Sequence, residues 1–246
     1  MAKTNYSYVG ISLIILIFGI IFIPRIVDRI TKGDVIREES RSKNLGMQAD
    51  SDIELAYLTI NGNPKKVPDF NFMNQNGIMI SNKDYEGKVY LVEFFFTTCP
   101  TICPRMSTNL VQIQKYFQGM ENFGIASITI NPTLDTSEVL KEYANNYGIT
   151  NPNWHLLTGK QDVIYELANQ GFNLYTAQEE EVEGGFEHSG NFALIDKQGF
   201  IRSRIVNGNP LIYYNGIISE QEQYNEDGMK EEISFLKQDI TKLLKE

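Results

Sequence analysis

Residues 89–106, which read VYLVEFFFTTCPTICPRM, constrain the fold more than any other part of the chain. The first part of this stretch is an apolar, aromatic and β-branched run of strand length, which predicts a buried strand. The run leads into Cys99 and Cys103, the two cysteines of the sequence. The sequence thus predicts a buried strand that carries two thiols at its end.

A helix is expected directly after this strand. Pro100 and Pro104 each follow a cysteine, and proline suits the first turn of a helix because its missing N–H would have no partner there. Apolar residues then recur at helical spacing, at positions 106, 110, 113 and 117. The helix therefore starts at one proline or the other, and its N-terminal N–H groups favour the thiolate form of the nearby cysteines.

Charge distinguishes the N-terminal part from the rest of the chain. The net charge is −9, although residues 1–33 contain four basic residues and one acidic residue. The remainder is therefore strongly acidic, which argues against nucleic acid as a partner.

The N-terminal region, residues 1–32, is predicted to be a membrane anchor. Residues 8–23 carry no charge and are almost wholly apolar, and counting from Tyr6 gives a single transmembrane helix at about 6–23. No small-residue cleavage site or lipidation cysteine follows it. A buried core helix is the less favoured alternative. The basic residues after the span would by themselves place the bulk of the chain in the cytoplasm.

Residues 33–65 are expected to link this anchor to a domain at 66–246, because residues 33–52 are charged and polar with little periodicity. The domain begins with alternating runs at 67–80 around Asn76-Gly77, which predict a β-hairpin. A β-branched run at 124–130 predicts the strand that follows the first helix.

The second half of the domain alternates between helix and strand signals. Asp135 to Glu138 reads DTSE, a helix-start signature, and Gly148 is the matching stop. The remaining expected elements are a strand at 154–157, a helix at 161–170, an acidic loop at 179–185, hairpin strands at 191–195 and 200–206, and a closing helix after Gly228 with apolar residues at 233, 236, 240 and 243.

This order, a βαβ half followed by a ββα half with cysteines at the first strand-to-helix junction, resembles the thioredoxin-like layout. The expected fold class is therefore α/β. We expect a thioredoxin-like fold with an N-terminal β-hairpin extension, preceded by the transmembrane helix.

Two thiolates and one imidazole would form a soft ligand set that suits copper or zinc. The sequence contains two histidines. His188 stands in a glycine-flanked loop before a strand, whereas His155 follows Trp154 inside a strand-like run, so His188 is the better candidate. Structural zinc normally takes four protein ligands, and three ligands suit Cu(I) better.

Other uses of the cysteine pair are open but less favoured. Thiol–disulfide exchange is the main rival, although the motif is C-x-x-x-C rather than C-x-x-C and no proline lies between Asn153 and Asn209. Peroxidase chemistry is disfavoured because Phe96 stands where peroxiredoxins have threonine. A structural disulfide is disfavoured because so short a loop gains little from closure.

Four segments together resemble the Sco/SenC family of copper chaperones: FFTTCPTICP, NPTLDTSEVLKEYA, WHLLTG and EHSGNFALIDKQGF. The match covers roughly residues 66–206. The spacing of Cys99, Cys103 and a histidine 85 residues later is its most specific part.

The resemblance implies that Cys99, Cys103 and His188 bind copper, and that the loop before His188 is mobile until metal binds. Asp135 matches an acidic position near the family's site, where it would support the ligands, although a helix cap is the favoured role for this residue. Two positions depart from the pattern, because Thr98 stands where many members have histidine and Asn131 where the family often has aspartate.

The family resemblance also implies a function and a place in the cell. We expect a copper metallochaperone, not an enzyme, anchored in the inner membrane with its soluble domain in the periplasm. It would serve the CuA centre of cytochrome c oxidase subunit II, and a thiol reductant protein would keep its cysteines reduced. The alternatives are a thiol–disulfide reductase and, less favoured, a redox or copper sensor.

Overall fold

The structure is a computed structural model, and it describes residues 16, 18, 24, 53–60, 62–178 and 186–246. The chain divides into two compact units, Met1–Leu45 and Gly46–Glu246, and the fold described below is that of the second. No helix within the described residues is long and apolar enough to cross a membrane. The expected span at 6–23, except positions 16 and 18, and the expected acidic loop at 179–185 lie outside the described residues.

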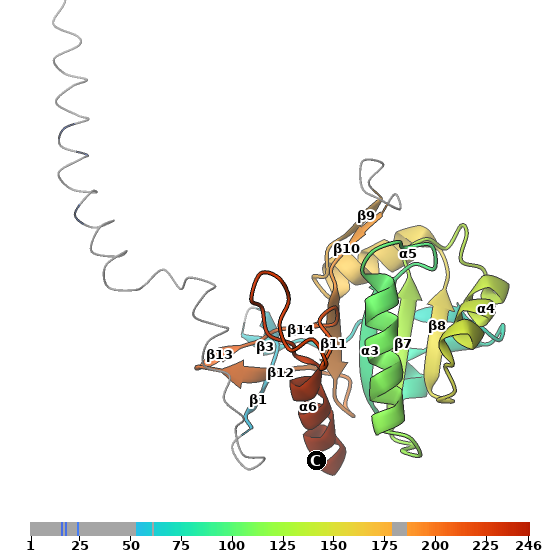
Figure 1. Ribbon diagram of the computed structural model, residues 1–246. Coiled ribbons are helices and arrows are strands. Elements are labelled where there is room, and N and C mark those ends of the chain that lie inside the picture. The colour runs from blue at the N-terminus through green and yellow to red at the C-terminus, as the bar shows by residue number, and fades with distance from the viewer. Residues whose placement is uncertain (1–15, 17, 19–23, 25–52, 61, 179–185) are drawn as a thin grey trace, which may run out of the picture. The chain divides into compact units, whose positions relative to one another are not determined.

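A mixed β-sheet forms the centre of the second unit (Figure 1). Its strands follow the order β1 (Leu55–Tyr57), β12 (Ile201–Val206), β11 (Asn191–Ile195), β6 (Val89–Phe95), β7 (Phe123–Thr129), β8 (Trp154–Thr158), β4 (Asn71–Asn74) and β5 (Met79–Ser81). β6 (Val89–Phe95), β7 (Phe123–Thr129) and β8 (Trp154–Thr158) run parallel to one another. Every residue of β6 and β7 is buried, which explains why both strands read as continuous apolar runs.

Helices pack on both faces of these parallel strands. α3 (Cys103–Tyr116) connects β6 to β7, and α4 (Ser137–Tyr147) connects β7 to β8, as the sequence predicted. Neighbouring strand residues point to opposite faces: Phe95 contacts Tyr143 of α4, whereas Phe94 contacts Phe172, which follows α5 (Gln161–Glu166) and a π-helical turn (Leu167–Gly171). Figure 1 shows α3, α4 and α6 (Ile233–Lys245) together on one side of the sheet.

The two predicted hairpins are confirmed. β4 (Asn71–Asn74) and β5 (Met79–Ser81) pair in antiparallel fashion, and Gly77 in the turn has a φ of +71°, which glycine adopts without strain. β11 (Asn191–Ile195) and β12 (Ile201–Val206) form the second hairpin, and β11 also pairs with β6. The central strand β6 therefore lies between β11 and β7.

Several short strands were not expected from the sequence. β1 (Leu55–Tyr57), β2 (Thr59–Ile60) and β3 (Asn63–Pro64) lie within the range assigned to the linker, and β1 pairs with β12. The others are β9 (Thr176–Gln178), β10 (Phe186–His188), β13 (Asn209–Pro210) and β14 (Tyr214–Asn215). Strands of two or three residues are too short to show alternation, and β1 finds its partner far along the chain.

Candidate metal centre

The cysteines lie where β6 gives way to α3. After Phe95 the chain turns, with the Cys99 N–H donating to the Phe96 carbonyl at 3.3 Å, and α3 begins at Cys103. Of the two prolines, it is therefore Pro104 that occupies the first turn of the helix. Cys99 is 7% exposed and Cys103 is 1% exposed. The Cys103 N–H, at the helix start, donates to the Cys99 Sγ at 3.4 Å.

His188 reaches this point from a different part of the chain. It is the last residue of β10, which pairs with β9 in a short hairpin, rather than part of the loop that the sequence suggested. Its Nε2 lies 3.1 Å from the Cys103 Sγ. The ring of Phe96 contacts the imidazole edge to face, with 5.8 Å between centroids and an interplanar angle of 81°.

The hydrogen bond of the second ring nitrogen, Nδ1, indicates which tautomer His188 adopts. Nδ1 lies 3.2 Å from the carbonyl oxygen of Ser189. Because a carbonyl only accepts hydrogen bonds, Nδ1 carries the proton in the neutral ring and Nε2 keeps its lone pair. Such a bond to the distal nitrogen is typical of metal-binding histidines, since it orients the ring.

The ligand atoms of Cys99, Cys103 and His188 all lie within 4.8 Å of one another. Among the residues that the structure describes, they are the one group of three or more His, Cys, Asp or Glu side chains close enough to hold a metal ion. The other histidine is elsewhere, because His155 lies on β8 and its Nδ1 is 3.2 Å from the amide nitrogen of Asn74. The fold thus brings together the two cysteines and the favoured histidine.

The two thiols have opposite pKa shifts. A hydrogen bond from the Cys103 thiol is the main cause of a lowered pKa at Cys99. Burial is the main cause of a raised pKa at Cys103. The Cys99 sulfur therefore holds a negative charge more readily than the Cys103 sulfur, which keeps its proton. A soft metal ion that binds both sulfurs must therefore displace the remaining proton.

Asp135 is hydrogen-bonded to the turn that leads from β6 to Cys99, which we call the cysteine turn. It is fully buried, and its carboxylate accepts hydrogen bonds from the Thr97 N–H at 3.1 Å and from the hydroxyls of Thr97 and Thr129. The N-cap of α4 is instead Thr136, whose side chain accepts from the Val139 N–H. The carboxylate therefore holds the backbone two residues before Cys99, and the capping role belongs to its neighbour.

The sequence did not predict the surroundings of two side chains near the end of β6. Phe96 argues against a peroxidase in the sequence, and in the structure its ring contacts His188. Glu93 is a buried acid on β6 whose pKa is raised to about 8 by loss of solvent. The signal was present in the sequence, since Glu93 is the one charged residue in the apolar run of residues 89–98.

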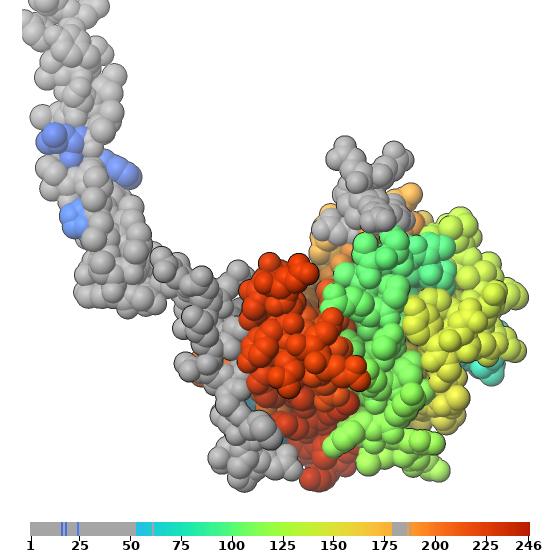
Figure 2. Space-filling model, viewed as in Figure 1, coloured from blue at the N-terminus to red at the C-terminus, as the bar shows by residue number. Residues whose placement is uncertain are grey.

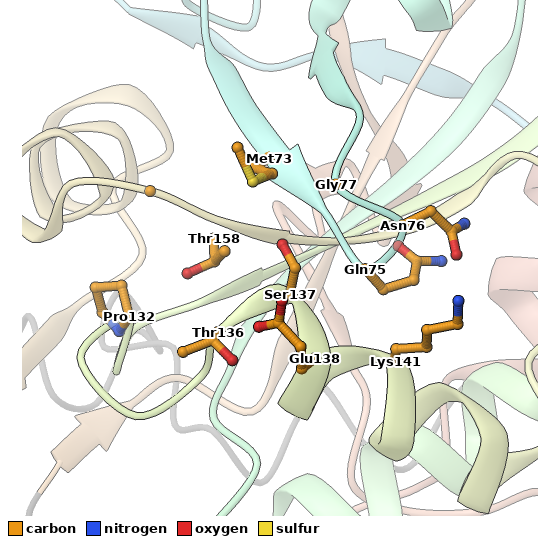
Figure 3. Close-up of a pocket in the computed structure, with 11 residues that line it drawn as sticks. Met73, Gln75, Asn76, Gly77, Pro132, Thr136, Ser137, Glu138, Lys141 and Thr158 are labelled. Carbon is orange, nitrogen blue, oxygen red and sulfur yellow. The ribbon is translucent and has the colours of Figure 1, made fainter.

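A separate cavity of about 580 Å³ lies between the β4–β5 turn and the start of α4. Figure 3 shows Met73, Gln75 and Asn76 across the cavity from Ser137, Glu138 and Lys141. No cysteine or histidine lines it. It therefore offers none of the thiolate and imidazole ligands that the cysteine–histidine group provides.

The sequence of this chain is similar to those of known proteins. The family model described as SCO1/SenC matches residues 59–214. The SCO1 protein homolog of Bacillus subtilis is 34% identical over 158 residues, which cover 63% of this chain and 80% of that protein.

Solved structures show the same fold. BsSco, described as having a disulfide switch and as a member of the Sco family of cytochrome c oxidase assembly proteins, matches with a TM-score of 0.57 and 27% identity over 74% of this chain and 94% of its own. Bradyrhizobium japonicum ScoI, solved with copper bound, matches with a TM-score of 0.55 and 18% identity over 73% and 99%. The architecture is thus the mixed α/β, thioredoxin-like fold expected from the sequence, and the chain belongs to the SCO1/SenC family.

Proposed function

We propose that this chain is a copper metallochaperone in which Cys99, Cys103 and His188 hold one copper ion for delivery to the CuA centre of cytochrome c oxidase. The observation that carries the proposal is the convergence of two sulfurs and one imidazole nitrogen within 4.8 Å. This soft set matches the ligand preference of Cu(I). The copper-bound relative and the family's part in oxidase assembly support the same cargo and recipient.

Three ligands suit a carrier better than a permanent site. A closed structural zinc site takes four protein ligands, whereas a three-coordinate ion can be attacked by an incoming thiolate or imidazole before the old bonds break. As a neutral ligand, His188 would contribute a lone pair without a charge, and Asp135 would keep the cysteine turn in its binding geometry. The chain then acts by transfer, and we propose no enzymatic role for it.

The cysteines must be reduced for this role, so the pair is also a redox gate. A disulfide between Cys99 and Cys103 would remove both thiolate ligands, and a protein that reduces it is a required partner in an oxidising compartment. We propose that residues 6–23 anchor the chain in the inner membrane and that the copper-binding domain faces the periplasm. A C-terminal topology reporter active only in the cytoplasm would contradict this orientation.

A Cu(I) competition titration on the reduced full-length chain tests the proposal. We expect one tightly bound copper per chain, loss of binding in Cys99→Ser and Cys103→Ser, and weaker binding in His188→Ala. His155→Ala is the matched control and should bind as the wild type does, because His155 lies away from the cysteines. Weak binding that is indifferent to His188 would refute the metal site.

The second candidate function is a thiol–disulfide reductase, favoured by the lowered pKa of Cys99. This function would require both cysteines but not His188. Reduction of a substrate disulfide at an unchanged rate by His188→Ala, together with weak copper binding by the wild type, would favour the reductase over the chaperone.

A further inference from the structure

The segment between β12 and α6 packs against α3. Its residues 214–218, which we call the 214–218 segment, are held by Asn109 of α3, a residue 1% exposed. The Asn109 side-chain amide donates to the carbonyls of Gly216 at 2.8 Å and Ile217 at 3.4 Å. Figure 2 shows the chain that precedes α6, in orange-red, lying beside α3, in green. An amide on the cysteine-bearing helix thus fixes the backbone of this segment.

The same segment is also bonded to the part of the chain that carries His188. The Gly216 N–H donates to the carbonyl of Gly190 at 2.8 Å, and β14 pairs with β11 through Asn191 and Asn215. Gly190 lies two residues after His188. The 214–218 segment therefore contacts both parts of the chain that supply the candidate ligands.

The side chain of Ile217 lies against Gly190. A Cβ at Gly190 would lie 2.6 Å from Cγ1 of Ile217, with Cδ1 closer still, and 3.6 Å from Cδ1 of Ile102. Ile102 is the N-cap residue of α3 and directly precedes Cys103. Gly190 is thus covered by Ile217, close to the N-cap residue Ile102 of the cysteine-bearing helix.

We propose that Ile217 is a positioning residue, which packs against Gly190 and thereby keeps the His188 imidazole at the two cysteines. This inference rests on the proposed copper-binding function. Packing is needed because β9 and β10 form a two-stranded sheet of three residues each, separate from the central sheet. So small a hairpin is only marginally stable by itself.

The test compares Ile217→Ala with Ile240→Ala in the full-length chain. Both remove the same atoms, and Ile240 is a fully buried residue of α6 that serves as the control for lost packing. We expect Ile217→Ala to raise the Cu(I) dissociation constant about tenfold, the lower range for residues that support metal ligands. The nitrogen hyperfine coupling of the Cu(II)-loaded protein should weaken as well. Ile240→Ala should change neither quantity, even if it lowers the unfolding temperature as much.

A double-mutant cycle identifies the route of the effect. If Ile217 acts through His188, then Ile217→Ala should cause no further loss of copper affinity in a His188→Ala background. Ile217→Val, which removes only Cδ1 and is expected to fold, should show a smaller change in the same direction. Gly190→Ala should resemble Ile217→Ala, since its Cβ would displace that side chain.

A copper-free measurement separates this inference from the proposed function. In a Cys99→Ser background without metal, Ile217→Ala should speed alkylation of Cys103, because the His188 hairpin no longer covers it as closely. Equal effects of Ile217→Ala and Ile240→Ala on alkylation and affinity would overturn the inference, as would an undiminished effect in the His188→Ala background. Absence of copper binding by the wild type would instead refute the proposed function, and the alkylation result would still decide the role of Ile217.

Discussion

Glu93 is an acidic side chain in the middle of the core, 2% exposed on the central strand β6. Its Oε1 accepts a hydrogen bond from the Ser127 hydroxyl at 2.6 Å. The Ser127 Oγ in turn accepts a hydrogen bond from the Trp154 Nε1–H at 3.0 Å. Its Oε2 has no hydrogen-bond partner within the described part of the chain. Burial of a charged carboxylate with so few donors is costly, so the proton is retained and the pKa of Glu93 rises to about 8.

This raised pKa predicts a pH-dependent loss of stability. In the unfolded chain the group should titrate near its ordinary value of 4.5, so between that value and about 8 the folded state binds the extra proton. The free energy of unfolding should therefore fall with rising pH by roughly 1.4 kcal/mol per unit in that window, and level off above it. Glu93→Gln removes this titration. Urea unfolding should show that the variant gains stability relative to the wild type as the pH rises from 4.5 to about 8. A difference in the free energy of unfolding that does not change with pH would contradict the raised pKa of Glu93.

Asp135 uses both carboxylate oxygens, and this predicts the effect of Asp135→Asn. One oxygen cannot serve all three donors from Thr97 and Thr129. We expect the free energy of unfolding to fall by about 1–3 kcal/mol, and Cu(I) affinity to fall about tenfold because the turn before Cys99 is released. Thr136→Ala is the control: loss of the N-cap should cost about 1 kcal/mol and leave copper affinity unchanged. Wild-type copper affinity in Asp135→Asn would argue against a supporting role.

At the scale of elements, α6 is attached to the sheet by a buried ion pair. Arg204 of β12 donates to Asp239 of α6 from Nε at 3.0 Å and from the terminal guanidinium nitrogen at 2.6 Å. The Tyr214 hydroxyl also donates to Asp239, at 2.7 Å, and the guanidinium lies over the ring of Phe235. Arg204 and Asp239 are almost fully buried, so each needs the other to compensate for lost solvation.

Removal of one residue of the Arg204–Asp239 pair should therefore lower the free energy of unfolding more than replacement of both. Asp239→Ala leaves the Arg204 guanidinium buried without its counter-charge and should lower the free energy of unfolding by about 3–5 kcal/mol. The double variant Arg204→Met/Asp239→Leu restores apolar packing and should be clearly more stable than Asp239→Ala, as measured by urea unfolding. If the double variant is no more stable than Asp239→Ala, the ion pair stabilises the fold by more than the mutual compensation of two buried charges.

Elements with strong local signals were predicted closely. α4 begins after the N-cap Thr136 and ends at Gly148, whose φ of +67° suits glycine, so the start and stop residues identified it. α3 was ambiguous between two prolines, because either could occupy a first turn. β1 and β14 gave no local signal, since each is stabilised by a partner strand distant in the sequence.

At the scale of the whole molecule, the candidate metal centre is assembled from three separate regions. The end of β6 and the start of α3 supply the cysteines, the β9–β10 hairpin supplies His188, and the 214–218 segment covers their junction. β11 connects these regions, because it pairs with both β6 and β14 and begins shortly after His188. The order of strands in the sheet therefore sets which side chains meet.

The sequence by itself determined the principal strands and helices, the position of the thiols at a strand-to-helix junction, and the family. These features depend on periodicity, on caps and on motif residues close together in the chain. Only the tertiary structure decided that His188 meets the cysteines while His155 contacts Asn74, that Asp135 holds Thr97, and that Ile217 covers Gly190. Each of these contacts joins residues far apart in sequence, and it forms only when the sheet has brought their strands together.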